Sequence, residues 1–290
     1  MNPYIADPDH IPKSDLYADV PHYGRYSPKP DDFRVDIQHV NSSSQESLQY
    51  WAGVVGLCTE SNMIYPADAN EGRDVFALGS VIVKSSHRHQ SPKIDHTYAD
   101  ANEIEAIAIA KRVLEGVRLP NIYFSGKING RPVLVQERLP GVSLEVARPY
   151  LSEAQKAAFK RQAREILLQM HAVKPPSNRQ TRDHIVPDPN IMTNGPLNSE
   201  EAQILFSKDI DQDLGFMHND FTPSNCIVDN DRIVGLIDWE MAGFFGWKAA
   251  GEVHCQIRCP RRKDFARAYL SEERLRDILW WNDLYDGAVP

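Results

Sequence analysis

The chain has 290 residues, of which 42% are hydrophobic, and a formal net charge of −8 at pH 7. This length and composition can bury a sizeable core in one large domain or two lobes, which excludes disorder as the dominant state. The acidic balance leaves no excess positive charge to follow a phosphate backbone, so nucleic acid is not expected as a partner. The four cysteines are too few and too unevenly spaced for a disulfide framework. No apolar run is long enough for a membrane helix, so we expect a cytoplasmic protein with neither signal peptide nor membrane span.

The first half of the chain predicts an irregular arm followed by a lobe rich in strands. Residues 1–45 are rich in Pro, Asp, Tyr and Ser and lack sustained periodicity. A short helix is expected over 47–58, and the β-branched run 75–85, interrupted in its middle, predicts two strands or one bulged strand. Apolar residues at helical spacing predict a helix over 101–115 that ends at a glycine, and another strand is expected over 132–137.

The second half predicts mainly helices. A long helix should begin after Ser152, with Gln155 as its capping-box partner, and end before Pro175-Pro176. The remaining expectations, in chain order, are a loop over 177–198, a helix over 199–207, short strands over 226–228 and 233–237, and a helix over 271–285. Strands in the first half and helices in the second predict an α+β chain with two unlike lobes.

The segment from His218 to Asn225, together with Asp238, carries the candidate chemistry. If Asn225 begins one strand of the hairpin and Asp238 ends its antiparallel partner, the two residues lie across from each other. Asp220 lies just upstream, so three oxygen-bearing side chains would meet at one end of the hairpin. Such a set suits a hard cation of the Mg²⁺ type that bridges nucleotide phosphates, while the remaining carboxylate accepts a hydroxyl proton. Any one of these residues could instead be a turn residue or a solvated carboxylate, and for His218 we favour a structural role.

The pattern His-Asn-Asp-x-x-x-x-Asn at 218–225, followed by Ile-Asp-Trp-Glu at 237–240, resembles the catalytic and metal loops of a known family. This is the aminoglycoside phosphotransferase and choline kinase family, particularly its branch abundant in fungi. The resemblance implies a bilobal protein-kinase-like fold, with a mixed N-lobe containing an antiparallel sheet and a mainly helical C-lobe. It also implies that Asp220 is the catalytic base and that Asn225 and Asp238 are Mg²⁺ ligands.

Two upstream segments extend the resemblance to a phosphate-binding ion pair. The run from Val81 to Lys84 resembles the family's strand that ends in a phosphate-binding lysine, although a solvated lysine at a strand end is the simpler alternative. Glu103 is its expected partner, because it shares a helix face with Ile107, Ala110 and Leu114. Glu105 is the second choice, and either glutamate could be only a favourable charge near a helix N-terminus.

The segment from Gln136 to Gly141 resembles the hinge between the lobes, where backbone groups contact the adenine edge. Glu137 and Leu139 are therefore placed among the nucleotide-binding residues, while an ordinary exit from a strand is the alternative. The implied organisation is an arm over 1–45, a nucleotide-binding N-lobe over 46–138, and a catalytic and substrate-binding C-lobe over 139–290.

Three departures from the family pattern refine the expectation. No Gly-x-Gly-x-x-Gly loop precedes Lys84, so the loop that covers the phosphates is not identified. The further aspartates of bacterial antibiotic kinases do not follow Asp238, which puts an aminoglycoside acceptor in doubt. The basic cluster at 258–263 is given no role, because most such runs are solvated faces.

The sequence as a whole predicts an enzyme that uses ATP and Mg²⁺ to transfer the γ-phosphoryl group to a hydroxyl of a small molecule. The alternative is a catalytically impaired, pseudokinase-like nucleotide-binding module. A protein kinase proper is disfavoured, because no Ala-Pro-Glu segment follows Asp238. The sequence makes no prediction about the oligomeric state.

Overall fold

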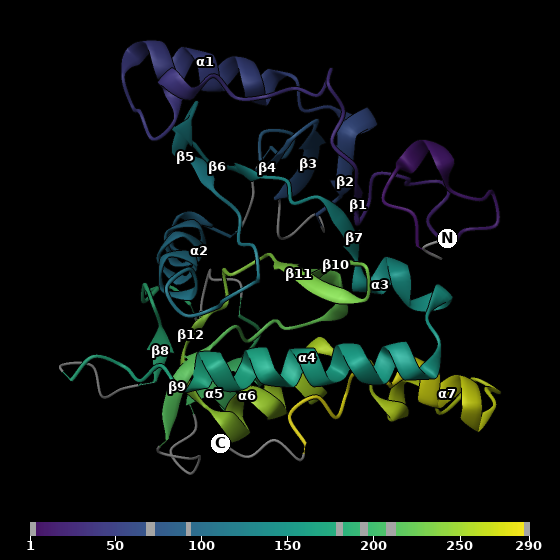
Figure 1. Ribbon diagram of the computed structural model, residues 1–290. Helices are drawn as coiled ribbons and strands as arrows, with labels where there is room; N and C mark the ends of the chain where they lie inside the picture. Colours follow the sequence, from purple (N-terminus) through teal and green to yellow (C-terminus); the bar gives the residue numbers. More distant parts are fainter. Residues whose placement is uncertain are drawn as a thin grey trace.

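The structure is a computed structural model that describes residues 4–67, 73–90, 94–177, 182–191, 197–206 and 213–286. Two lobes lie one above the other, a smaller one built on a sheet and a larger one dominated by helices (Figure 1). The predicted α+β class is therefore confirmed. Each lobe has its own hydrophobic core. Within the described residues, we find no helix with the length and apolar character needed to cross a bilayer.

The smaller lobe contains a five-stranded antiparallel sheet with strand order β2-β3-β4-β6-β5. The strands are β2 (Met63–Tyr65), β3 (Asp74–Leu78), β4 (Val81–Ser85), β5 (Ile122–Ile128) and β6 (Arg131–Glu137). The run 75–85 forms two strands rather than one bulged strand, because Gly79 adopts a φ of +48° and lets the chain reverse tightly between β3 and β4. Strand β5 was not predicted from the sequence.

Two helices pack against this sheet. Helix α1 (Gln45–Gly56) runs across the outer end of the lobe in Figure 1, and its Trp51 ring stacks on Phe124 of β5 with centroids 5.2 Å apart. Helix α2 (Thr97–Ala110) lies between the sheet and the larger lobe. It ends five residues before the expected position, because hydrogen-bonded turns after Ala110 bring Leu114 into the core.

The larger lobe is organised around the long helix α4 (Glu153–His171). Ser152 and Gln155 form the predicted capping box at its N-terminus. Its apolar stripe is buried as expected, and α5 and α6 lie on the far side of α4 in Figure 1. The other helices are α3 (Leu144–Ala147), α5 (Ser199–Phe206), α6 (Trp247–Val253) and α7 (Glu272–Ile278), and a π-helix spans His254–Arg258. Short 3₁₀ turns span Pro8–His10, Ile37–His39, Glu60–Asn62, Arg148–Tyr150, Pro223–Asn225 and Arg262–Phe265.

The prediction of a helix over 271–285 is wrong for the second half of that range. Only α7 is helical, and the following turns bury Trp281 and Tyr285 instead of exposing one side of a helix. The indole nitrogen of Trp281 donates to the carbonyl oxygen of Phe221 at 2.8 Å. These tertiary contacts stabilise an irregular path that periodicity alone cannot reveal.

Two small sheets complete the larger lobe. One has the order β1-β7-β10-β11, with β1 (Arg25–Tyr26), β7 (Gly141–Ser143), β10 (Cys226–Asp229) and β11 (Arg232–Leu236). The other has the order β8-β12-β9, with β8 (Asp183–His184), β9 (Leu214–Met217) and β12 (Gly243–Gly246). Strands β8, β9 and β12 were not predicted, since each is short and pairs with a segment distant in the sequence.

The N-terminal arm contacts both lobes. Tyr4 is buried in the core of the larger lobe, and its hydroxyl lies 3.3 Å from the Asp231 carboxylate. Strand β1 pairs antiparallel with β7, and the carbonyl oxygen of Phe33 accepts a 3.0 Å hydrogen bond from the amide of Ser80 in the smaller lobe. The irregular conformation expected for the arm holds over most of its length, but β1 and these contacts anchor it.

Candidate active site

A loop between β9 and β10 presents His218, Asn219 and Asp220 at the junction of the lobes. His218 is fully buried, its Nε2 lies 3.1 Å from the carbonyl oxygen of Ile237, and its ring packs 4.4 Å from that of Trp239. Burial lowers the pKa of His218 to about 4, so the ring is neutral near pH 7. The predicted structural role of His218 is confirmed by these contacts.

Asp220 is hydrogen-bonded to Asn225, which lies at the end of the same loop. The side-chain nitrogen of Asn225 donates to Asp220 Oδ2 and to the Asp220 carbonyl oxygen, both at 2.9 Å. Arg258 Nε lies 3.4 Å from Oδ1. Burial raises the pKa of Asp220 to about 7, although the positive charge of Arg258 opposes this shift. A carboxylate with a pKa in this range can exchange a proton with a hydroxyl group near neutral pH.

The register of the β10–β11 hairpin differs from the expected one. Asn225 lies across from Ile237, whose amide donates to the Asn225 carbonyl oxygen at 3.1 Å, rather than across from Asp238. The turn consists of Asn230 and Asp231, both with positive φ, and a bulge shifts the register between Ile227 and Val228, just before the turn. The predicted pairing is therefore wrong by one residue. Asp238 itself has a φ of +65°, which turns it out of the strand direction.

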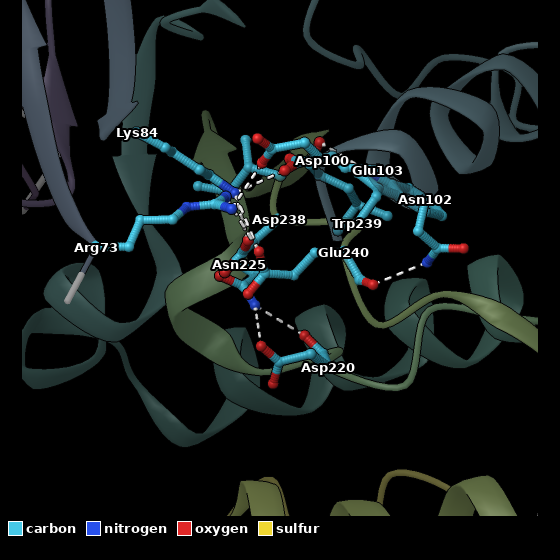
Figure 2. Close-up of polar contacts among 12 residues, drawn as sticks. Arg73, Lys84, Asp100, Asn102, Glu103, Asp220, Asn225, Asp238, Trp239 and Glu240 are labelled. Carbon is cyan, nitrogen blue, oxygen red and sulfur yellow. Dashed lines mark hydrogen bonds and ion pairs between the residues drawn. The ribbon is translucent and has the colours of Figure 1, made fainter. Parts of the chain in front are cut away.

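Lys84 joins the two lobes through its ammonium group. Its Nζ lies 2.7 Å from Glu103 Oε2 on α2 and 2.6 Å from Asp238 Oδ1 in the larger lobe (Figure 2). Lys84 is 6% exposed, so the reading of it as a solvated strand-end lysine is wrong. Burial disfavours the charged amine, but Asp238 and Glu103 outweigh this effect and raise its pKa.

Glu103, rather than Glu105, is the partner of Lys84, as predicted from the helix face. Glu103 is fully buried, whereas Glu105 is exposed to solvent. Burial raises the pKa of Glu103, and Lys84 opposes this shift. For Asp238 burial also raises the pKa, but the adjacent Lys84 outweighs burial and the net pKa is lowered.

Three charged residues of this cluster were not predicted as site residues from the sequence: Arg73, Asp100 and Glu240. Arg73, directly before β3, donates to Asp100 Oδ1 at 2.6 Å and to Glu240 Oε2 at 3.1 Å. Asn102 of α2 donates to the carbonyl oxygen of Glu240 at 2.8 Å (Figure 2). Glu240 belongs to the Ile-Asp-Trp-Glu pattern, which was a usable signal, but nothing in the sequence distinguishes Arg73 from a surface arginine.

The cluster has the charge and donors that suit a divalent cation. Carboxylate oxygens of Glu103, Asp238 and Glu240 lie within 4.8 Å of one another. With Asp100 the cluster holds four carboxylates against the two cations Lys84 and Arg73, a formal excess of two negative charges. Glu103 Oε1 is buried and has no hydrogen-bond partner among the residues that the structure describes. The residues present therefore fit a hard cation with oxygen ligands.

Of the two predicted metal ligands, Asp238 lies in this carboxylate cluster. Asn225 turns its amide nitrogen to Asp220, which leaves its side-chain oxygen as the atom able to face a cation. In Figure 2, Asn225 lies between Asp238 and Asp220.

The side chain of Glu137 is directed away from the carboxylate cluster. Its Oε2 accepts from Asn121 Nδ2 at 2.8 Å, and its Oε1 contacts Arg118. The amide of Arg138 donates to Ser80 at 2.9 Å, while Leu139 is buried where the chain passes between the lobes. Any contact of Glu137 with a nucleotide would therefore use its backbone.

The loop that covers the phosphates stays unidentified, and one stretch before Lys84 is the connection between β2 and β3. Residues 68–72 of this connection lie outside the described residues. Its last residue, Arg73, lies in the carboxylate cluster.

The basic cluster at 258–263 is not only a solvated face. Arg261 and Arg262 form surface ion pairs with Asp264 and Glu272. Arg258, in contrast, is 3.2 Å from the carbonyl oxygen of Asn219 and contacts Glu201. The expectation of a solvated face is therefore wrong for Arg258, which lies beside Asp220.

The chain is similar to several solved structures at low sequence identity. Among solved structures, similar ones include the streptomycin–ATP ternary complex of APH(2")-IIa, with 14% identity, 84% of this chain and 83% of that chain covered, and a TM-score of 0.47. The apo form of a thermostable mutant of aminoglycoside phosphotransferase APH(4)-Ia has 15% identity, coverage of 83% and 91%, and a TM-score of 0.44. Macrolide 2'-phosphotransferase MphH from Brachybacterium faecium has 14% identity, coverage of 84% of each chain, and a TM-score of 0.41.

A search of curated protein sequences gave no match. The sequence profile of the phosphotransferase enzyme family (APH) matches residues 74–244, more than half of the 290 residues. The matched segment includes Lys84, Asp220, Asn225 and Asp238. The chain, with its bilobal kinase-like fold, therefore belongs to the phosphotransferase enzyme family.

Proposed function

We propose that this protein transfers the γ-phosphoryl group of ATP to a hydroxyl group of a small molecule, in a reaction that requires Mg²⁺. The observation that carries the proposal is the meeting of Lys84 from the smaller lobe with Asp238 from the larger lobe, 2.6 Å apart, at the junction that also contains Asp220. Phosphoryl transfer depends on positioning and charge neutralisation more than on covalent chemistry, and this set of residues supplies both.

Each residue has a distinct part in the proposed reaction. Lys84, oriented by Glu103, binds phosphate oxygens that are not transferred, and the backbone near Glu137 and Leu139 contacts the adenine. Asp238 and Asn225 would hold the cation, with Glu240 close to them. When bound, Mg²⁺ supplies positive charge that neutralises the phosphate oxygens. Asp220 orients the acceptor hydroxyl and accepts its proton as the hydroxyl oxygen bonds to the γ-phosphorus, while the bond from that phosphorus to the β,γ-bridging oxygen breaks and ADP leaves.

We assign nucleotide binding and catalysis to different lobes. Residues 46–138 would bind the nucleotide, residues 139–290 would supply catalysis and the acceptor site, and residues 1–45 form the arm that contacts both. The family to which the chain belongs supports phosphotransfer. One of the similar structures, that of APH(2")-IIa, is a ternary complex with streptomycin and ATP. The fungal branch of the family stays a prediction.

The test compares Asp220→Asn with Asp238→Asn. Isothermal titration should give wild-type Mg·ATP affinity within a few-fold for Asp220→Asn, while turnover falls by ~10² or more, because a positioned general base is lost. Asp238→Asn should lose metal-dependent ATP affinity together with activity, because one charge of the cation site is removed. The exposed Asp229 provides a matched control, and Asp229→Asn should behave as wild type.

Turnover is measured as ADP formation in a screen of amines, sugars and hydroxylated secondary metabolites. A protein that fails to bind ATP at millimolar concentration would contradict any nucleotide-dependent function. A wild type that binds Mg·ATP but phosphorylates no acceptor and forms no ADP would instead support the pseudokinase-like alternative.

A further inference from the structure

Arg258 connects three separate elements next to Asp220. It is the last residue of the π-helix that continues α6, and its Nε donates to the carbonyl oxygen of Asn219 at 3.2 Å. The same nitrogen lies 3.4 Å from Asp220 Oδ1. Another nitrogen of the guanidinium contacts the carboxylate of Glu201 on α5. Arg258 therefore bridges the catalytic loop and α5.

The two oxygens of the Asp220 carboxylate have different neighbours. Oδ2 accepts from the Asn225 side chain at 2.9 Å, and Oδ1 faces Arg258. The peptide before Asp220 is also restrained, because Asn219 has a φ of +59° and its side chain donates to the Met241 carbonyl oxygen at 3.1 Å. Neighbours on both oxygens and on the preceding carbonyl restrict the rotation of the Asp220 side chain.

Glu201 determines where the guanidinium can lie. It is 1% exposed, and its contact with Arg258 is closer than the contact between Arg258 and Asp220. A buried carboxylate holds a guanidinium firmly, because leaving either charge without its partner is costly. Glu201 thus keeps Arg258 from moving fully onto Asp220, where a two-bond ion pair would occupy the oxygens needed by a hydroxyl group.

The π-helix gives Arg258 its direction. The amide of Cys259 donates to the carbonyl oxygen of His254 at 3.0 Å, a bond over five residues that widens the helix by one residue. His254 Nε2 lies 2.9 Å from the Trp281 carbonyl oxygen, which fixes the start of this turn. The extra residue changes the angle at which Arg258 leaves the helix, compared with a regular α-helical turn.

We infer that Arg258, fixed by Glu201, is a positioning residue that holds the Asp220 carboxylate in the orientation needed to accept the proton of the acceptor hydroxyl. This inference rests on the proposed phosphotransfer function. Because Arg258 contacts Asp220 and not the carboxylate cluster around Lys84, its loss should slow turnover without weakening nucleotide binding.

The test uses Arg258→Gln and Arg258→Lys, with Arg261→Gln as matched control in the same segment. ADP formation from Mg·ATP with water as the acceptor gives kcat and KM, and isothermal titration gives the affinity for Mg·ATP. Arg258→Gln should lower kcat by about 10-fold or more while the Mg·ATP affinity stays within about 2-fold, since only orientation is lost. Arg258→Lys should restore part of kcat, and Arg261→Gln should match wild type.

A double variant covers the case in which Arg258→Gln does not fold because Glu201 is left buried without a partner. Arg258→Met/Glu201→Met removes both charges, so it should fold and show the same selective loss of kcat. Wild-type kcat in either folded variant would overturn the inference. Equal losses of kcat and of Mg·ATP affinity would also overturn it, because they would indicate a general structural defect.

A second readout does not require turnover. In carboxyl-labelled protein, the ¹³C resonance of Asp220, assigned with Asp220→Asn, should shift in Arg258→Gln and return towards wild type in Arg258→Lys. An unchanged resonance would overturn the inference even if turnover fell. A wild type that forms no ADP with water or with any acceptor of the screen, but shows this shift, would contradict the proposed function and leave the contact between Arg258 and Asp220 supported.

Discussion

At the scale of single residues, the ion pairs of Lys84 and Arg73 connect the two lobes at their junction. Both cations come from the smaller lobe, and each reaches a carboxylate that follows the β10–β11 hairpin in the larger lobe. Lys84 contacts Asp238, and Arg73 contacts Glu240. The cations therefore have two roles: they offset buried negative charge and they hold the lobes together.

Arg73 should contribute strongly to stability. Arg73→Met leaves Asp100, a buried carboxylate whose pKa is raised by burial, without its closest positive partner. We expect the free energy of unfolding to fall by about 3 kcal/mol, since breaking a buried ion pair leaves an uncompensated charge. Urea denaturation would measure this. The double variant Arg73→Met/Asp100→Asn should recover most of the loss, and equal stabilities of wild type and Arg73→Met would contradict the expectation.

At the scale of elements, the π-helix carries a histidine that responds to pH. Burial lowers the pKa of His254 to about 4, compared with about 6.5 in the unfolded chain. The unfolded state therefore binds a proton first as pH falls. The stability due to neutral His254 is fully present above pH 6.5 and is lost progressively down to about pH 4.

This histidine should steepen the acid side of the stability profile. Between pH 7 and pH 5 it should contribute a loss of about 2 kcal/mol in the free energy of unfolding, which His254→Gln should not show. Urea unfolding of both proteins at the two pH values measures the difference. Equal losses in wild type and His254→Gln would mean that the His254 ring is not held neutral by the fold.

Features of the fold and the site that depend on residues close together in the sequence could be predicted. Helix α2 has apolar residues three, four and seven positions apart on the face that carries Glu103, and strand β4 is a β-branched run that ends near Lys84, so both could be predicted. The capping box of α4 is a local pattern and was also predictable. These features depend on residues close together in the sequence.

Features that depend on distant contacts were not predictable in the same way. The register at Asn225 and Asp238 depends on the left-handed conformation of two turn residues and on a bulge, neither of which periodicity reveals. Arg73 and Arg258 resemble surface arginines until the fold brings Asp100 and Glu201 beside them. Such pairs join residues far apart in the chain, so spacing alone gives no signal.

At the scale of the whole molecule, the N-terminal arm is held by a buried ion pair. Asp15 Oδ2 lies 2.5 Å from an Arg25 nitrogen, both side chains are almost fully buried, and the Tyr150 hydroxyl also contacts Asp15. Arg25 begins the strand that pairs with β7. The attachment of the arm to the larger lobe therefore depends on a charge pair shielded from solvent.

Removal of this pair should release the arm. Asp15→Ala leaves the Arg25 guanidinium buried without its counter-charge, so the arm should open more often and trypsin should cut sooner after Arg25. The rate is followed by mass spectrometry of timed digests, with the exposed Asp19 providing the control variant Asp19→Ala. If Asp15→Ala and Asp19→Ala were cut at the same rate, the arm would not depend on this pair.

The four-stranded sheet has a consequence for the order in which the chain folds during its synthesis. Strand β1 pairs with β7, so Tyr26 cannot pair until Gly141, 115 residues later (141 − 26), has been synthesised. The contact of Tyr4 with Asp231 spans 227 residues. Contacts of such long sequence separation form slowly, because a long loop must close before they contribute. The arm is synthesised before its partners on β7 and near Asp231, and it is thus expected to reach its final position later than segments with local contacts.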